Sequence, residues 1–255
     1  MSSRPEIAVI LAAGRGRRMK AIGLSQPKGF LRLGELPIVE ESVLRLLAAG
    51  IRKVVIVTGH LAQHYVDLAK SYPHKLTLVN NPVFAESGSM HSLYLAQPHI
   101  SGDFLLLESD LIYEQRALTE ILADPARDVL LVSGVTGSGD EVYVEVRNGL
   151  LHDLSKERAR ADRNIWGEMV GIWRISVDYY GEIIQTAQCT SKQATRMEYE
   201  QVLAAAARRM PVRCRLIEDL LWSEIDDEVQ LARAKHHIYP AIVARDGLLN
   251  YGAPQ

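Results

Sequence analysis

The residues with the clearest capacity for chemistry follow an apolar run near the start of the chain. The run Ile7–Leu11 has the composition of a buried strand. It leads into a turn with two glycines and several cations, and a lysine follows after a proline: Ala12, Ala13, Gly14, Arg15, Gly16, Arg17, Arg18, Met19, Pro27 and Lys28. Backbone N–H groups in a glycine-rich turn can come close to a ligand, and the cations add positive charge there. The pattern predicts a site for a polyphosphate, and therefore for a nucleotide.

The same turn begins the dinucleotide fingerprint G-x-G-x-x-G, which would indicate a nicotinamide-dependent oxidoreductase. Met19 stands where that fingerprint has its third glycine, so the close packing of helix on strand is missing. The second predicted strand is followed by Thr58-Gly59-His60, without an acidic residue for a ribose hydroxyl. Both differences argue against a dinucleotide site.

Acidic residues follow two further apolar segments. Asp110 comes just after the strand predicted at Phe104–Glu108, and a carboxylate at the carboxyl end of a parallel strand faces the ligand crevice. Near the C-terminus, Glu224 and Asp226 are two residues apart, so on a strand they share one face. Each of these acids could instead have a purely structural role at a helix N-terminus. Asp110 precedes a predicted helix that it could cap, and Asp226 begins an acidic run that would favour the dipole of the last helix.

Small and aromatic residues suggest where other parts of a substrate could bind. Ser87, Gly88, Ser89 and Ser92 surround a predicted helix N-terminus, where backbone and hydroxyl groups can approach a ligand; a plain helix cap is the alternative. The second half of the chain adds aromatic and acidic residues that could enclose a cation: Trp166, Glu168, Trp173, Tyr199, Glu200, Trp222 and Glu224. For Trp173 and Tyr199, a place in the core is an equal alternative.

Strands and helices alternate in the first half of the chain. The predicted strands are Ile7–Leu11, Val54–Thr58, Leu76–Val79, Phe104–Glu108 and Asp128–Ser133, and the predicted helices are Val39–Ala49, Ala62–Ser71, Ser89–Ala96 and Gln115–Ala123. This order predicts an α/β fold with a Rossmann-like, mostly parallel sheet covered by helices on both faces.

The pattern changes after the turn-rich stretch 136–140. A hairpin is predicted from Glu141–Val146 and Gly149–Leu154, followed by strands at Met169–Ile175 and Val212–Ile217 and helices at Val177–Thr186, Met197–Arg209 and Glu228–His237. We therefore expect one domain over residues 1–255, with a nucleotide-binding core at 1–135 and a small mixed α+β lid extension at 136–255.

Composition narrows the classes of function. The net charge of −2 gives no basic field for nucleic acid, and no apolar run is long enough to span a membrane. The N-terminal residues have no signal-peptide pattern, and two cysteines without metal-like spacing fit a reducing compartment, so we expect a cytoplasmic protein. The sequence leaves the oligomeric state open, a homodimer included.

The turn and the Pro-Lys pair resemble the signature of the sugar-phosphate nucleotidyltransferase superfamily, L-A-A-G-x-G-x-R-[LM] followed by Pro-Lys. Gly14, Gly16, Arg18, Met19, Pro27 and Lys28 stand in matching places, and the likeness extends to about Ala241. Within that superfamily, Met90–Leu93, Leu107–Asp110 and Trp222–Asp226 are most similar to the 2-aminoethylphosphonate and phosphocholine cytidylyltransferases.

The resemblance implies a Mg²⁺-dependent transfer of CMP from CTP to a small phosphonate, with 2-aminoethylphosphonate as the best acceptor. It implies that Leu11, Ala12, Ala13, Gly14 and Gly16 hold the triphosphate and that Arg15, Arg18 and Lys28 stabilise charge during transfer. Asp110 and Asp226 would hold Mg²⁺. Ser87, Gly88, Ser89 and Ser92 would meet the base or the acceptor, and Glu168, Tyr199, Glu200 and Glu224 would bind the acceptor.

Several alternatives stay open at this point. The acceptor could be phosphocholine, 2-hydroxyethylphosphonate, phosphonoformate or a sugar phosphate. A nucleotide-binding regulator without catalysis would be expected to lack Lys28 or the metal acids, which are present. The choice of cytosine over uracil or thymine rests on the resemblance alone.

Overall fold

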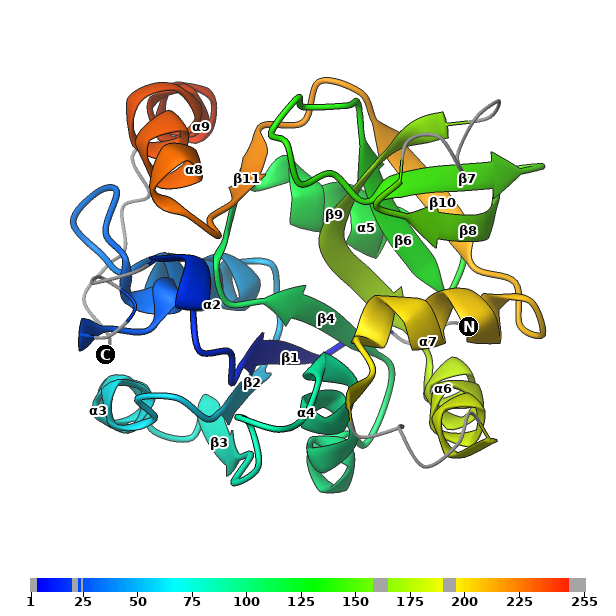
Figure 1. Ribbon diagram of the computed structural model, residues 1–255, viewed down its shortest axis with the longest axis horizontal. Coiled ribbons are helices and arrows are strands. Elements are labelled where there is room, and N and C mark those ends of the chain that lie inside the picture. Colours follow the sequence, from blue (N-terminus) through cyan, green and yellow to red (C-terminus); the bar gives the residue numbers. More distant parts are fainter. Residues whose placement is uncertain (1–3, 20–22, 24, 158–164, 190–195, 248–255) are drawn as a thin grey trace.

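The structure is a computed structural model that describes residues 4–19, 23, 25–157, 165–189 and 196–247. Its strands are β1 (Ile7–Ala12), β2 (Lys53–Thr58), β3 (Leu76–Asn80), β4 (Phe104–Glu108), β5 (Leu111–Tyr113), β6 (Val129–Ser133), β7 (Tyr143–Arg147), β8 (Leu150–Ser155), β9 (Ile165–Ile175), β10 (Arg213–Ile217) and β11 (Trp222–Glu224). Within the described residues, one sheet has the order β3-β2-β1-β4-β9-β6-β10-β8-β7 (Figure 1). β5 pairs with β11 in a second, small sheet.

The helices are α2 (Ile38–Ala48), α3 (Gln63–Ser71), α4 (Ser89–Leu95), α5 (Arg116–Ala123), α6 (Val177–Cys189), α7 (Tyr199–Ala207), α8 (Glu228–Arg233) and α9 (Tyr239–Asp246). Single 3-10 turns lie at Arg17–Met19, Lys28–Phe30 and Gln97–His99, and a π-helical turn at Ala234–Ile238 joins α8 to α9. Among the described residues, no helix combines the length and the apolar character that a membrane crossing requires.

The parallel half of the sheet explains why its strands are apolar throughout. β1 pairs in parallel with β2 and β4, and every residue of β1 is buried. Alternate β1 residues face opposite sides, so Val9 and Leu11 join a core cluster with α4, α6 and α7, while Ala8 and Ile10 join one with α2, α3 and α5. The predicted sheet with helices on both faces is confirmed.

The second half of the chain extends the same sheet. β9 lies between β4 and β6 and is antiparallel to both, and β10 lies beside β6 in parallel. β7 and β8 form the predicted hairpin, which also pairs with β9. These strands make the sheet mixed beyond its parallel part. The division of the domain at residue 135 stays a prediction.

The C-terminal helices pack back on the start of the chain. The last helix predicted at Glu228–His237 is α8 and the π-helical turn, and α9 follows with Pro240 in its first turn, where a missing N–H costs nothing. Ile225, Ala234 and Ile242 share a small core cluster with Met19, which is fully buried. Met19 thus anchors the end of the glycine-rich turn in the interior.

Candidate active site

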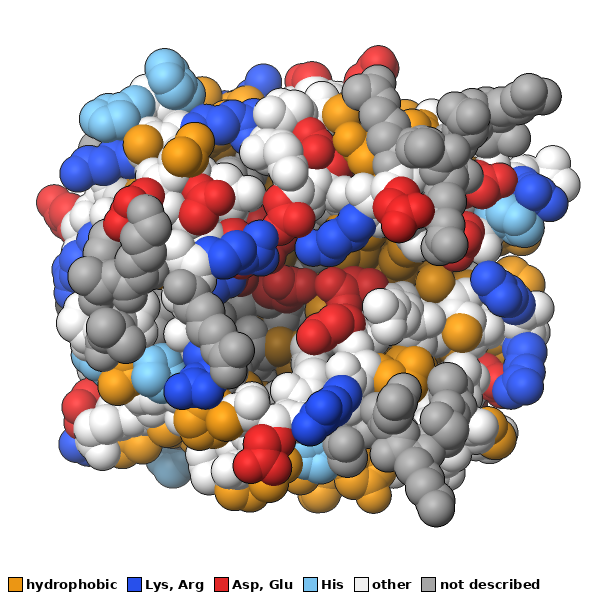
Figure 2. Space-filling model, viewed as in Figure 1, with side chains coloured by type: hydrophobic (Ala, Val, Ile, Leu, Met, Phe, Trp, Pro, Cys, Tyr) orange, Lys and Arg blue, Asp and Glu red, His pale blue; other side chains and the backbone are white. Residues whose placement is uncertain are grey.

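A cleft of about 750 Å³ opens at the carboxyl ends of β1 and β4. Figure 2 shows it as a hollow with acidic side chains inside and basic side chains at its rim. Of the residues that the resemblance assigns to the site, the cleft brings together all but one: Leu11, Ala12, Ala13, Gly14, Arg15, Gly16, Arg18, Lys28, Ser87, Gly88, Ser89, Ser92, Asp110, Tyr199, Glu200, Glu224 and Asp226. Glu168 is the exception.

The two glycines of the N-terminal turn are there for different reasons. Gly16 has a φ of +57°, a backbone conformation that side chains with a Cβ disfavour, and its carbonyl accepts from the Met19 N–H at 2.9 Å. Gly14 has no such φ, and a Cβ built on it would meet no protein atom within 4 Å. Gly16 therefore shapes the turn, whereas Gly14 leaves open space in the cleft beside the backbone.

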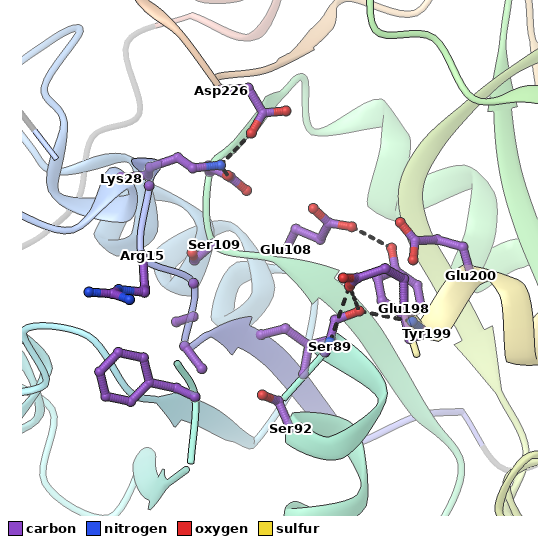
Figure 3. A pocket seen from close by; sticks show the side chains of 18 of the residues that line it. Arg15, Lys28, Ser89, Ser92, Glu108, Ser109, Glu198, Tyr199, Glu200 and Asp226 are labelled. Atoms are coloured by element: carbon purple, nitrogen blue, oxygen red, sulfur yellow. Dashed lines mark hydrogen bonds and ion pairs between the residues drawn. The ribbon is translucent and has the colours of Figure 1, made fainter. Parts of the chain in front are cut away.

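Lys28 joins the two acids predicted to share a metal. Its Nζ lies 2.5 Å from Oδ2 of Asp110 and 2.5 Å from Oδ1 of Asp226, and both carboxylates are nearly buried (Figure 3). Burial alone would lower the pKa of Lys28, but the two carboxylates raise it above its ordinary value. Burial alone would raise the pKa of Asp226, and Lys28 lowers it instead. The lysine and both acids thus converge at one point.

A short strand pairing explains how residues so far apart in sequence meet. β5 begins directly after Asp110, and β11 ends two residues before Asp226. The two strands are antiparallel, with Glu224 opposite Leu111, and the Ile225 N–H donates to the Asp110 carbonyl at 3.1 Å. The Asp227 side chain caps α8 by accepting from the Gln230 N–H, so the helix-capping role falls to Asp227.

Arg18 reaches across the mouth of the cleft. It pairs with Asp140 at 2.6 Å and with Asp226 at 2.8 Å. Lys156, which sequence reasoning missed, also lines the cleft and donates to Asp140 at 3.2 Å. Arg15 is exposed at the rim. Cations from the N-terminal turn and from the end of β8 therefore face the same space.

Three half-buried carboxyl groups, those of Glu108, Glu200 and Glu224, form the inner wall. Burial, followed by repulsion from Glu200 and Asp110, raises the pKa of Glu108 to about 8, and Tyr199 donates to it at 2.6 Å. Burial also raises the pKa of Glu200 and of Glu224. A cation bound at this wall would relieve the repulsion among these carboxylates and favour their ionised form.

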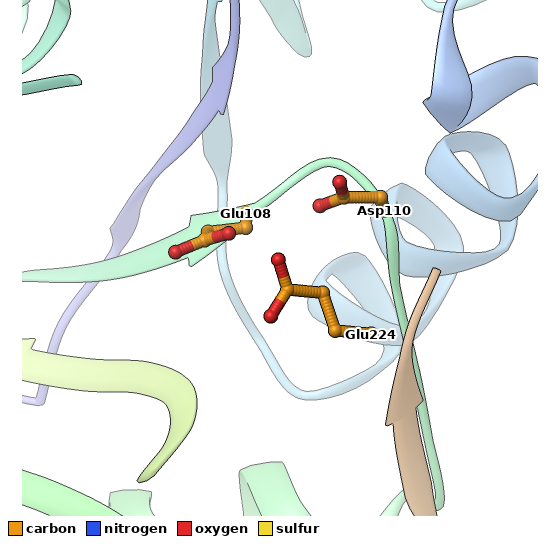
Figure 4. A group of neighbouring side chains, drawn as sticks. All are labelled: Glu108, Asp110 and Glu224. Atoms are coloured by element: carbon orange, nitrogen blue, oxygen red, sulfur yellow. The ribbon is translucent and has the colours of Figure 1, made fainter. Parts of the chain in front are cut away.

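One oxygen from each of Glu108, Asp110 and Glu224 lies within 4.8 Å of the others (Figure 4). These oxygens suit Mg²⁺, which prefers carboxylate and phosphate ligands. Asp110 therefore has two acidic partners on different sides: Asp226 through Lys28, and the pair Glu108 and Glu224. Glu108 had no predicted role, although it shares the run 107–110 with Asp110 and that spacing was a usable signal.

The serines at the start of α4 divide into two groups. Ser89 donates to Oε2 of Glu198 at 2.6 Å and accepts from the Tyr199 N–H at 2.8 Å, so it ties α4 to α7. Ser87 and Ser92 instead accept from the side chain of Asn81, a buried residue without a predicted role. A Cβ on Gly88 would lie 2.2 Å from the Met197 carbonyl oxygen. A neighbouring chain segment therefore requires the glycine there.

The predicted aromatic enclosure for the acceptor is only partly assembled. Trp173 is fully buried in the core. Trp222 is also buried, and its indole N–H donates a hydrogen bond to the Ser133 hydroxyl at 2.8 Å. Neither they nor Trp166 line the cleft. Glu168 is 2% exposed, accepts from the Thr136 N–H, and borders a recess of about 40 Å³ beside the cleft. Tyr199, Glu200 and Glu224 are the predicted acceptor residues that do face the cleft.

Comparison with known proteins identifies relatives of this arrangement. Residues 8–167 match a family described as the MobA-like NTP transferase domain. A bifunctional IPC transferase and DIPP synthase of Thermococcus kodakarensis is 26% identical over 247 residues, which are 95% of this chain and 53% of that protein. A 2-aminoethylphosphonate cytidylyltransferase of Lancefieldella rimae is 30% identical over 106 residues, 41% of this chain and 43% of that protein.

A solved structure gives the same fold. The inositol-1-phosphate CTP transferase of T. maritima superposes with a TM-score of 0.80, at 20% identity, over 95% of this chain and 98% of that one. The matched part of the chain spans about half the length of the first two curated relatives.

Proposed function

Because the chain belongs to the MobA-like NTP transferase domain family, and so to the nucleotidyltransferases, we propose that it transfers CMP from CTP to a small phosphonate or phosphate. The observation that carries the proposal is Lys28, held between Asp110 and Asp226 beside the glycine-rich turn. A cation, two acids and open backbone in one cleft are what a nucleoside triphosphate requires.

The residues of the cleft then have distinct tasks. The backbone from Ala12 to Gly16 holds the triphosphate, and Arg15 and Arg18 stabilise the departing pyrophosphate. An oxyanion of the acceptor attacks the α-phosphorus of CTP. A new P–O bond forms, the bond to the β-phosphate oxygen breaks, and its electron pair leaves with pyrophosphate. The acceptor is already anionic, so no strong general base is needed, and positioning with charge neutralisation supplies the rate.

Lys28 is placed to bridge the α-phosphate and the incoming oxyanion once it leaves the two aspartates. Asp110 and Asp226 would hold Mg²⁺, which would neutralise phosphate charge when bound. Lys156 faces the cleft from the end of β8 and is suited to the phosphoryl group of the acceptor.

The inner wall of half-buried carboxyl groups supports an acceptor with a primary ammonium, and 2-aminoethylphosphonate is our first candidate. Glu108, Glu200 and Glu224 can accept hydrogen bonds from an ammonium and share its charge. A quaternary ammonium, as in phosphocholine, is better served by aromatic walls, and none of the three tryptophans lines the cleft.

A polyol phosphate is the second candidate. The relative that aligns over 95% of this chain is an IPC transferase, and the solved neighbour is an inositol-1-phosphate CTP transferase. The same three carboxyls could accept hydrogen bonds from hydroxyl groups.

Pyrophosphate release from Mg²⁺–CTP tests the proposal directly. The acceptors would be 2-aminoethylphosphonate, inositol 1-phosphate, phosphocholine, 2-hydroxyethylphosphonate and phosphonoformate, with Asp110→Asn as the inactive control. Release with one acceptor, absent in the control, supports the transfer and identifies the substrate. Nucleotide binding without release for any of them would instead indicate a regulator.

A further inference from the structure

The side chain of Asn81 has a fixed orientation at the edge of the cleft. Its Oδ1 accepts from the Val83 N–H at 3.0 Å, and a backbone N–H can only donate, so the amide nitrogen must face the other way. The Asn81 N–H donates to the Thr58 carbonyl at the end of β2, and the residue is 1% exposed. The amide is therefore held rigidly.

The amide nitrogen of Asn81 donates to two hydroxyl groups at once. Nδ2 lies 3.0 Å from Oγ of Ser87 and 3.0 Å from Oγ of Ser92, and both serines line the cleft. In the part of the chain that the structure describes, neither serine donates its hydroxyl hydrogen to a protein acceptor. A hydroxyl that accepts one hydrogen bond becomes a stronger donor for the next, because the bonds polarise one another. Two neighbouring hydroxyl donors thus face the cleft.

The surroundings of the serine pair suit a nucleobase. Phe84 lines the same part of the cleft, and a base can stack on an aromatic ring. A Cβ on Gly59 would lie 2.7 Å from Cβ of Phe84, so the glycine makes room for this side chain. Figure 3 shows Ser89 turned toward Glu198 and Tyr199, with Ser92 on another side of α4.

We propose that Asn81 is a positioning residue that makes Ser87 and Ser92 select cytosine over uracil. Cytosine presents two adjacent acceptors, N3 and O2, to a pair of donors. Uracil and thymine place an N–H donor next to O2, so the hydroxyl that faces N3 would have to accept from it with its remaining lone pair and would leave its own hydrogen without an acceptor in the base. The inference rests on the proposed function and supplies its base preference, which sequence resemblance alone had suggested.

Calorimetric titration with Mg²⁺–CTP and Mg²⁺–UTP, without acceptor, tests this on the whole chain. The wild type should bind CTP more tightly than UTP. Asn81→Asp keeps the shape of the side chain and the acceptor for the Val83 N–H. Its second oxygen, however, would accept hydrogen bonds from both serine hydroxyls, which would then present lone pairs instead of hydrogens to the cleft. The preference for CTP should then fall roughly tenfold or more. Ser87→Ala and Ser92→Ala should each weaken CTP binding and reduce the preference.

Ser42→Ala is the matched control, because this buried serine is hydrogen-bonded to the Tyr113 hydroxyl at 2.8 Å and does not line the cleft. It should leave the CTP-to-UTP ratio unchanged even where it lowers the midpoint of thermal unfolding. If the Asn81 variant fails to fold, the two serine variants decide the matter. A wild-type ratio in folded Ser87→Ala and Ser92→Ala would overturn the inference, while CTP turnover with an acceptor would still support the proposed function. A wild type that binds neither nucleotide would overturn both.

Discussion

The ammonium nitrogen of Lys28 lies 2.5 Å from Oδ1 of Asp226, although 198 residues separate the two in sequence. The same nitrogen lies 2.5 Å from Asp110. Lys28 thus stands between the two carboxylates that would hold a divalent cation. A cation that enters between Asp110 and Asp226 must compete with the lysine, and this competition can be measured without any turnover.

Lys28→Met should lower the free energy of unfolding in EDTA by a few kcal/mol, because removal of one partner leaves nearly buried charges unpaired. Millimolar Mg²⁺ should restore more stability to the variant than it adds to the wild type, because the variant has no competing ammonium. Urea unfolding with and without Mg²⁺ measures both effects. Lys70→Met, which removes an exposed pair with Asp67, should show neither. Equal gains from Mg²⁺ in variant and wild type would contradict the competition.

Lys28→Ala and Asp110→Asn should each reduce the rate of pyrophosphate release by about 10²–10³, the usual loss when one well-placed charge is removed from a transfer site. Circular dichroism should show that the secondary structure is retained. The measurement is kcat with saturating Mg²⁺–CTP and the best acceptor of the panel. Activity near the wild-type value in either variant would show that the assigned role is wrong.

Gly14→Ala and Gly16→Ala should separate binding from folding. Gly16→Ala forces a side chain into the left-handed region and should destabilise the protein by about 1–2 kcal/mol. Gly14→Ala meets no protein atom and should leave the unfolding midpoint unchanged, yet its methyl group should weaken nucleotide binding. Thermal unfolding and CTP titration of both variants test the pair. A Gly14 variant that binds CTP normally would mean that the phosphates do not approach there.

Stability should depend on pH through Glu108. Burial raises its pKa to about 8 from an ordinary 4.5, so between these values the folded protein binds more protons than the unfolded chain. Stability must therefore fall as pH rises through this range. Glu108→Gln cannot ionise and should lose less stability between about pH 5 and pH 9 in EDTA. Urea unfolding measures the loss in each protein. An equal loss of unfolding free energy in wild type and variant over this pH range would rule out the raised pKa of Glu108.

Glu200→Gln should act on the acceptor and not on CTP. If an ammonium binds at the inner wall, KM for 2-aminoethylphosphonate should rise roughly tenfold, because a charge-assisted hydrogen bond becomes a neutral one. KM for CTP should stay within about twofold, since Glu200 lies on α7 away from the glycine-rich turn. Glu168→Gln, outside the cleft, is the control. Equal effects of the two substitutions would argue against an ammonium at Glu200.

The elements that sequence predicts well are those with a local signal. β1, β2 and β4 are apolar on both faces, and their predicted bounds agree with the structure to within a residue. The glycine-rich turn with its cations and Asp110 leave a pattern in adjacent residues, at a glycine turn and at a strand end. Asp226 was identified mainly through the resemblance of Trp222–Asp226 to the cytidylyltransferases.

Other features depend on contacts between distant segments. β5 and β11 are three residues each and become strands only by pairing with one another, so periodicity could not reveal them. Trp173 is central to the core because β9 inserts beside β4. The sequence of a strand does not show which strands will lie beside it. Lys156 and Asn81 carry no motif, and only the folded chain brings them to the cleft.

The position of β9 has a consequence for shortened forms of the chain. β6 ends at Ser133, but its neighbours β9 and β10 come from later residues, and β4 pairs with β9 on its outer side. A fragment that stopped at residue 135 would leave β6 without either neighbour and β4 with an exposed apolar edge. An exposed edge of this kind promotes aggregation. A shortened chain must therefore extend at least through Ile217, the end of β10, for β4 and β6 to keep their neighbours in the sheet.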